Sequence, residues 1–225
     1  MLNPFYQILG NNLVANVTNF TVWFAVTFWV FLETESVFAT GMIAGVYLVM
    51  TAALGFWLGS IVDHNSKKLT MMGSSLVSFA FYGAAVVMLL LEPAGAFGDP
   101  YGPYLWGFIL LTMLGVIAGN IRSIALPTLV TMLIPEDRRD KANGLVGMVS
   151  GIGFLTTSVI SGLLVAYGGM MGVLVMALVL SALAFFHLHL VHLDEKRVPL
   201  AEGEKEEPKT VDIRGTIAVI AAVPG

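Results

Sequence analysis

The sequence contains no cysteine among its 225 residues, and it carries little charge. Without cysteine the chain forms neither disulfides nor thiolate metal sites, and no redox compartment is indicated. Charged residues make up 12% of the chain and hydrophobic residues 57%, against about 25% and about 45–50% in soluble domains. So few charged side chains cannot cover the surface of a soluble fold of this length. The composition therefore predicts a protein solvated mostly by lipid.

Six stretches are apolar for long enough to cross a bilayer, which takes about 20 residues. We expect spans at Leu13–Leu32, Ala39–Ile61, Leu69–Leu91, Tyr104–Leu133, Leu145–Tyr167 and Met170–Leu190, none of which contains Asp or Glu. The fourth stretch is too long for a straight helix along the membrane normal. Pro127 within it predicts a bend, because proline removes the hydrogen bond to the Ser123 carbonyl.

Lys and Arg residues are distributed unevenly between the connections. The connections 33–35, 92–103 and 168–169 contain none, whereas ten of the eleven lie in 67–68, 138–141 and 191–214. The positive-inside rule places the second set in the cytoplasm. With six spans, the N-terminus is then also expected in the cytoplasm.

The chain divides into three parts by composition. Residues 1–190 hold the six spans, and residues 191–214 form a polar segment that cannot bury enough apolar surface to order itself, so we expect a cytoplasmic linker. Residues 215–225 become apolar again but are too few to satisfy their backbone in lipid. We interpret them as the truncated start of a seventh span, and the chain as a fragment of a longer protein.

Glycines recur at four-residue spacing within the spans. The pairs are Gly41 and Gly45, Gly55 and Gly59, Gly115 and Gly119, and Gly147 and Gly151. This spacing favours close helix–helix packing in lipid.

The connection from Gly59 to Lys68 resembles a signature of the major facilitator superfamily. That signature, between the second and third helices, reads glycine, three residues, aspartate, a basic residue, any residue, glycine and two basic residues. The matching residues are Gly59, Asp63, Lys67 and Lys68, while His64 and Ser66 replace the first basic residue and the second glycine. The resemblance implies that Asp63 helps to gate the transporter by contacting the opposite half. For the two lysines, gating and the positive-inside rule are alternative explanations.

The stretch from Leu126 to Gly144 looks like the fourth-to-fifth helix connection of bacterial drug-efflux members, especially macrolide-efflux-like ones. The resemblance covers nearly the whole chain. It implies an all-α membrane protein, a six-helix bundle built of two inverted three-helix repeats that forms the N-terminal half of a twelve-helix fold. It also implies secondary active transport by alternating access in a bacterial inner membrane, with efflux of a drug-like or amphipathic compound.

The partners that follow are the lipid bilayer, a small-molecule substrate, the missing C-terminal six-helix half and protons as a candidate coupling ion. No cofactor and no nucleic acid are implied. The fifth span lacks the glycine-proline pair of many antiporters, and no span carries an acid, so any proton carrier is expected in the missing half. Import of a metabolite and a non-transporting scaffold stay open as alternatives. An enzyme is disfavoured because no zinc-protease, phosphate-loop or nucleophile-elbow motif occurs.

By the resemblance, spans one and four line the central cavity. In span one, Asn12, Asn16, Asn19 and Trp23 fall on one helix face, and their polar groups cannot point into lipid without cost. This face either binds substrate or bonds to neighbouring helices. In span four, Arg122 is the only charge inside any span. A buried arginine marks a functional site by default, where it attracts an anionic group or biases a proton-carrying acid, and the alternative is a structural pair.

Overall fold

A computed structural model describes residues 4–193, in which all regular elements are helices and no strand occurs. The elements are α1 (Pro4–Thr34), α2 (Val37–His64), α3 (Lys67–Leu90), α4 (Pro103–Gly119), α5 (Ile121–Leu133), the short 3₁₀ helix η1 (Glu136–Arg138) and α6 (Arg139–Leu190). The expected seventh-span start and most of the expected linker lie outside the described residues. Within the described part, five helical stretches are long and apolar enough to cross a membrane.

The expected fifth and sixth spans both fall within α6, whose backbone is not helical at Gly169 (φ 59°, ψ −171°). Positive φ values favour glycine because it has no Cβ. Val146 and Leu188 lie far from Gly169 on its two sides, yet both pack in the core cluster around Leu126. They can meet there only if the two parts of α6 run in opposite directions. The chain therefore turns back on itself at Gly169, and α6 consists of two antiparallel arms.

Two serines begin the helices that follow the short connections. Ser36 precedes α2 and accepts a hydrogen bond from the Ala39 backbone N–H at 3.1 Å, and Ser66 precedes α3 and accepts from Leu69 at 3.3 Å. Each hydroxyl satisfies an N–H group that the first helical turn leaves unpaired. The short connections between α1 and α2 and between α2 and α3 therefore form tight turns.

The long fourth stretch is interrupted at Asn120, seven residues before Pro127. The Asn120 N–H bonds to the Ile117 carbonyl and the Ser123 N–H to the Asn120 carbonyl, both at 3.0 Å. These are three-residue steps of the 3₁₀ type, which tighten the backbone locally. Pro127 lies inside α5, so the predicted break exists but its position differs from the one that proline alone suggests.

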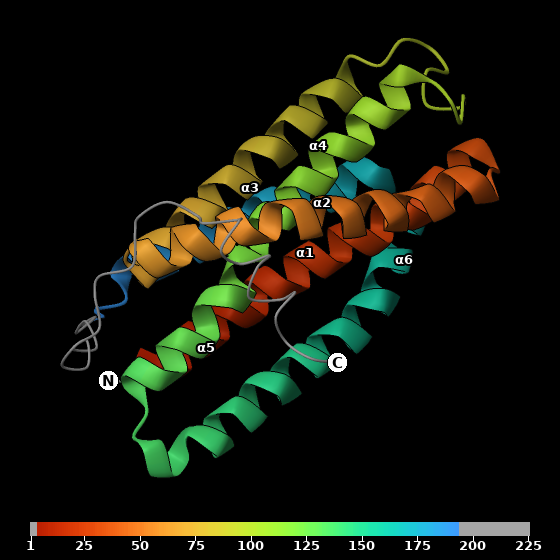
Figure 1. The fold of residues 1–225 in the computed structure, drawn as a ribbon. Coiled ribbons are helices and arrows are strands. Elements are labelled where there is room, and N and C mark those ends of the chain that lie inside the picture. Colours follow the sequence, from red (N-terminus) through yellow and green to blue (C-terminus); the bar gives the residue numbers. More distant parts are fainter. Residues whose placement is uncertain (1–3, 194–225) are drawn as a thin grey trace, which may run out of the picture.

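Burial is very uneven among the helices. The most apolar window of Pro103–Leu133 is 67% buried and that of α1 is 50% buried, whereas that of α2 is 11% buried. Figure 1 shows α1 running through the middle of the bundle, where it packs mainly against α6 and, less extensively, against α4 and α2. The helices α1 and α4–α5, which were expected to line the cavity, are therefore the most buried helices of the described bundle.

The basic connections gather at one end of the bundle. The N-terminus of α1, the α2–α3 and α5–α6 connections and the end of α6 share this end, and the turn at Gly169 lies at the other (Figure 1). In the part of the chain that is described, Arg122 is the one Lys or Arg residue away from it. The end with Lys and Arg is called the basic end below.

Candidate functional site

Five aromatic side chains form a continuous band from α2 across α1 to the first arm of α6. This aromatic band consists of Tyr47, Trp23, Phe24, Phe20 and Phe154. Neighbouring ring centroids are 6.0 Å apart for Tyr47 and Trp23, 5.0 Å for Trp23 and Phe24, and 5.3 Å for both Phe24 and Phe20 with Phe154. All five side chains are at least partly exposed. Since aromatic pairs at such separations attract one another, the band is a preformed apolar surface.

Polar groups border the aromatic band. Asn120, at the break between α4 and α5, donates from Nδ2 to the Tyr47 hydroxyl at 2.9 Å. The Trp23 indole nitrogen and the Thr51 hydroxyl are buried and have no hydrogen-bond partner among residues 4–193. Asn16 is half-buried one helical turn before the band's first α1 residue. The arrangement is suited to stacking a flat molecule while hydrogen-bonding its edge.

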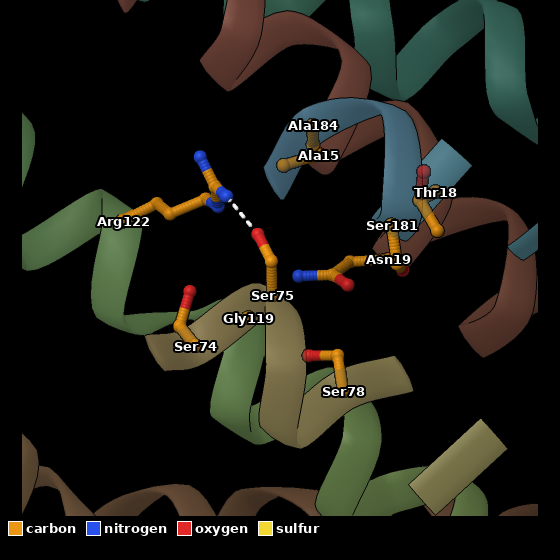
Figure 2. A pocket seen from close by; sticks show the side chains of 10 residues that line it. All are labelled: Ala15, Thr18, Asn19, Ser74, Ser75, Ser78, Gly119, Arg122, Ser181 and Ala184. Carbon is orange, nitrogen blue, oxygen red and sulfur yellow. Dashed lines mark hydrogen bonds between the residues drawn. The ribbon is translucent and has the colours of Figure 1, made fainter. Parts of the chain in front are cut away.

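A second polar group is buried inside the bundle around Arg122, whose side chain is 1% exposed. Its Nη1 donates to Asn11 Oδ1, and its Nη2 donates to the Ser75 hydroxyl and, at 3.1 Å, to the Met71 carbonyl. Figure 2 shows the guanidinium from α5 meeting Ser75 on α3. All of these acceptors are neutral, so the cluster solvates the positive charge without cancelling it.

Asn11 connects this cluster to the second arm of α6. Its Oδ1 accepts from Arg122, so its Nδ2 faces α6, where it donates to the Ala184 carbonyl at 2.8 Å and lies 3.2 Å from His187 Nδ1. The Asn11 amino group can only donate hydrogen bonds, so His187 Nδ1 must be the acceptor in this arrangement. The hydrogen-bonded chain therefore runs from the buried arginine to an exposed histidine near the basic end.

Three of the five predicted cavity residues belong to these two regions or lie beside them, and the other two, Asn12 and Asn19, are buried elsewhere along α1. Trp23 belongs to the aromatic band and Asn16 lies beside it. Arg122 is buried in its own cluster, and Asn12 is buried with its Oδ1 unpartnered within the described residues. Asn19 is also buried, and it bonds to protein.

The contacts of Asn19 join three helices at mid-bundle. Its Oδ1 accepts from the Tyr82 hydroxyl at 3.2 Å, and its Nδ2 donates to the Val116 carbonyl at 3.4 Å. Its carboxamide lies against Gly119, where a Cβ would overlap it. In this structure Asn19 therefore forms hydrogen bonds between helices, which was the alternative to substrate binding.

The signature residues lie at the basic end. The Asp63 carboxylate is exposed and forms no ion pair within the described chain, and a Cβ on Gly59 would meet nothing within 4 Å. Lys67 donates to the Val62 carbonyl at 2.6 Å and to the Asp63 carbonyl at 3.2 Å, at the end of α2. Lys68 donates to the Val191 carbonyl at 2.6 Å, just after α6. Both lysines bind helix ends, whereas Gly59 and Asp63 face outward.

Several residues of both regions were missed by the sequence analysis. Phe20 and Phe24 follow Asn16 at four-residue steps, a spacing that could have placed them on its face. Tyr47 and Phe154 come from helices whose orientation no local pattern fixes. Asn11 neighbours the predicted asparagines but points to another helix, so only the packing reveals its role.

A comparison with protein-family models identifies the family. The description of the matching family is Major Facilitator Superfamily, and the match covers residues 8–223. No curated protein and no solved structure matches the chain. The match covers nearly the whole sequence, and members of this family move small molecules across membranes. The chain is therefore an integral, multi-pass membrane protein of the major facilitator superfamily.

Proposed function

We propose that this chain is the N-terminal half of an alternating-access exporter of flat, amphipathic, drug-like compounds, and that the aromatic band is its part of the binding surface. The band carries the proposal because its partly exposed rings can stack on a substrate, the amides of Asn16 and Asn120 border them, and the band contains no charged side chain. The described chain also buries Arg122 away from this surface. A compound with an aromatic body and a few polar edges fits such a surface best.

A further set of helices completes the transporter in this proposal. The helix α2 exposes large apolar side chains along its length, including Leu48, Val49, Phe56 and Trp57, and the first arm of α6 exposes Ile152, Leu155 and Val159. Glycines on both, such as Gly55 and Gly151, have open space where a Cβ would stand. These surfaces flank the aromatic band, so a C-terminal six-helix half lying against them would close a cavity over it. The inverted three-helix repeats belong to the same proposal.

The orientation and gating follow from the basic end. The Lys and Arg residues there favour a cytoplasmic location for it, in a bacterial inner membrane. Asp63 stands exposed at this end, where it can meet basic groups or a helix N-terminus of the second half in one of the two transport states. We assign the outward-facing Gly59 and Asp63 to the gate, with Lys67 and Lys68 holding the helix ends beside them.

The complete coding sequence, expressed in bacteria that lack their own efflux pumps, tests the proposal. Cells should accumulate less of the aromatic cation ethidium, and Trp23→Ala should raise the half-saturating concentration for export by roughly 2- to 10-fold, the value of a lost aromatic contact. Phe186→Ala is the control, because Phe186 is 63% exposed on the second arm of α6, outside the band and outside the surface proposed for the second half. In the same assay Asp63→Asn should slow turnover and leave that concentration unchanged.

The competing functions give different results. Energy-dependent uptake into right-side-out vesicles would indicate an importer, and no movement in either direction would indicate a scaffold. Equal effects of Trp23→Ala and Phe186→Ala on the half-saturating concentration would show that the band is not part of the binding surface of a working transporter.

A further inference from the structure

A small polar cavity lies at mid-height of the bundle, between α1, α3, α5 and the second arm of α6 (Figure 2). Asn19, Ser78 and Ser181, which help line it, stand near the midpoints of α1, α3 and that arm. Its polar lining residues are all at least nine-tenths buried. The cavity volume is about 10 Å³, which is roughly the room that one water molecule needs.

The charge beside this cavity is uncompensated. Arg122 lines it, and three of the five guanidinium N–H groups bond to the neutral acceptors Asn11, Ser75 and Met71. No carboxylate pairs with it within residues 4–193, where every Asp and Glu lies in a connection or near a helix end. A guanidinium buried in a membrane bundle is costly unless a partner carries the opposite charge.

Hydrogen-bond donors face the cavity and lack acceptors. Two N–H groups of Arg122 form no hydrogen bond to the described chain, and neither does the Ser181 hydroxyl. Asn19 Nδ2 uses one of its two hydrogens in a long contact of 3.4 Å with the Val116 carbonyl. The three side chains come from α5, α6 and α1 and surround the cavity (Figure 2). Their unused donors would all point to a negatively charged acceptor.

We propose that the cavity binds one halide ion, which is chloride under cellular conditions. A water molecule leaves the arginine charge uncompensated, whereas a halide is the smallest anion that would compensate it, and polyatomic anions such as sulfate are larger. The halide accepts from Arg122, Asn19 and Ser181 and joins three helices through one ion. The site lies inside a single bundle, so it is distinct from the aromatic band and does not depend on the substrate proposed for it.

Halide titration of the purified 225-residue chain in detergent tests the site. The protein is exchanged into sodium gluconate at constant ionic strength, and its melting temperature is followed as chloride or bromide replaces gluconate. A bound ion stabilises the folded state in a saturable way, so the melting temperature should rise to a plateau with either halide and stay flat with sulfate.

Variants locate the effect. Arg122→Gln should abolish the halide-dependent rise, and Ser181→Ala should raise the half-saturating chloride concentration about tenfold, as expected for one hydrogen bond to a charged group. Lys141→Gln, which removes an exposed charge at the basic end, should change nothing. If Arg122→Gln does not fold, the half-saturating chloride concentration of Ser181→Ala tests the site by itself.

Two results would overturn the proposal. One is a melting temperature that does not depend on halide, which would mean that the cavity holds water. The other is a halide response that survives Ser181→Ala unchanged but is lost in Lys141→Gln, which would place the ion on the surface.

Discussion

At the scale of single residues, a glycine and an asparagine determine how closely α1 and α4 approach. Gly119 leaves just enough room for the carboxamide of Asn19, and Gly115 faces the ring of Tyr82, whose Cε1 would lie 2.5 Å from an added Cβ. The same tyrosine bonds to Asn19. Small residues at helix contacts let backbones approach in lipid, and here they also make room for a buried polar side chain.

Gly119→Ala should therefore destabilise the bundle by about 1–3 kcal/mol, the usual cost of forcing an extra methyl group into a packed interior. Thermal unfolding of the purified chain measures it. Gly73→Ala is the matched control, since Gly73 is an exposed helical glycine where an added methyl group would meet nothing within 4 Å, and alanine favours helix by up to about 1 kcal/mol. Equal melting temperatures for the two variants would contradict the close approach.

At the scale of elements, the two signature lysines hold the helix ends together at the basic end. Lys67 binds carbonyl groups in the last turn of α2, its own neighbour in sequence. Lys68 instead reaches from α3 to the carbonyls of His189 and Val191 at the end of α6, at 3.2 and 2.6 Å. A cation at a helix C-terminus compensates the partial negative charge of its unpaired carbonyls. Lys68 thereby ties together segments about 120 residues apart.

Lys68→Met should loosen the last turn of α6 without unfolding the bundle. Losing a cation at a helix end costs about 0.3–1 kcal/mol, so amide hydrogen exchange at residues 187–191 should become about 2- to 5-fold faster. Lys141→Met, which replaces an exposed lysine near the start of α6, should leave these amides unchanged. Exchange that is equally slow in both variants would show that the contact contributes nothing to the end of α6.

At the scale of the whole molecule, the described bundle has one well-packed side and one open side. The α4–α5 pair and α1 are packed between other helices, whereas α2 is buried over only 11% of its apolar window. The connections at the basic end carry the positive charge, and the connections at the other end, including Glu33, Glu35 and Glu92, carry negative charge alone. This asymmetry fixes how the bundle should insert.

Reporter fusions at Asn65 and Gly98 test the insertion. Asn65 lies in the α2–α3 connection at the basic end, and Gly98 lies in the α3–α4 connection at the opposite end. The cytoplasmic reporter should be active at Asn65 and the external one at Gly98, because Lys and Arg near spans are retained inside. Activity of both fusions on one side would contradict the membrane topology.

Composition and hydropathy were enough to predict the class of protein and the approximate positions of its helices. Its lack of charge indicated lipid as solvent, and the six expected spans fall on the five observed apolar helices, the fifth and sixth both within α6. Their ends were less predictable: α1 begins at Pro4 rather than Leu13, because polar residues such as Asn11 remain helical when neighbouring helices bond to them. A hydropathy profile detects the apolar middle of a helix. It does not detect polar terminal turns that are helical because neighbouring helices bond to them.

Which face of each helix meets which neighbour became clear from the packed bundle alone. The line of Asn16, Asn19 and Trp23 looks uniform in sequence, yet Asn19 is enclosed by α3 and α4 while the other two lie on the open side. The partners of Arg122 come from α1 and α3, far from it in the chain. Helical periodicity places residues on a common face, but the direction of that face depends on contacts between distant segments, and these exist only after the helices have packed.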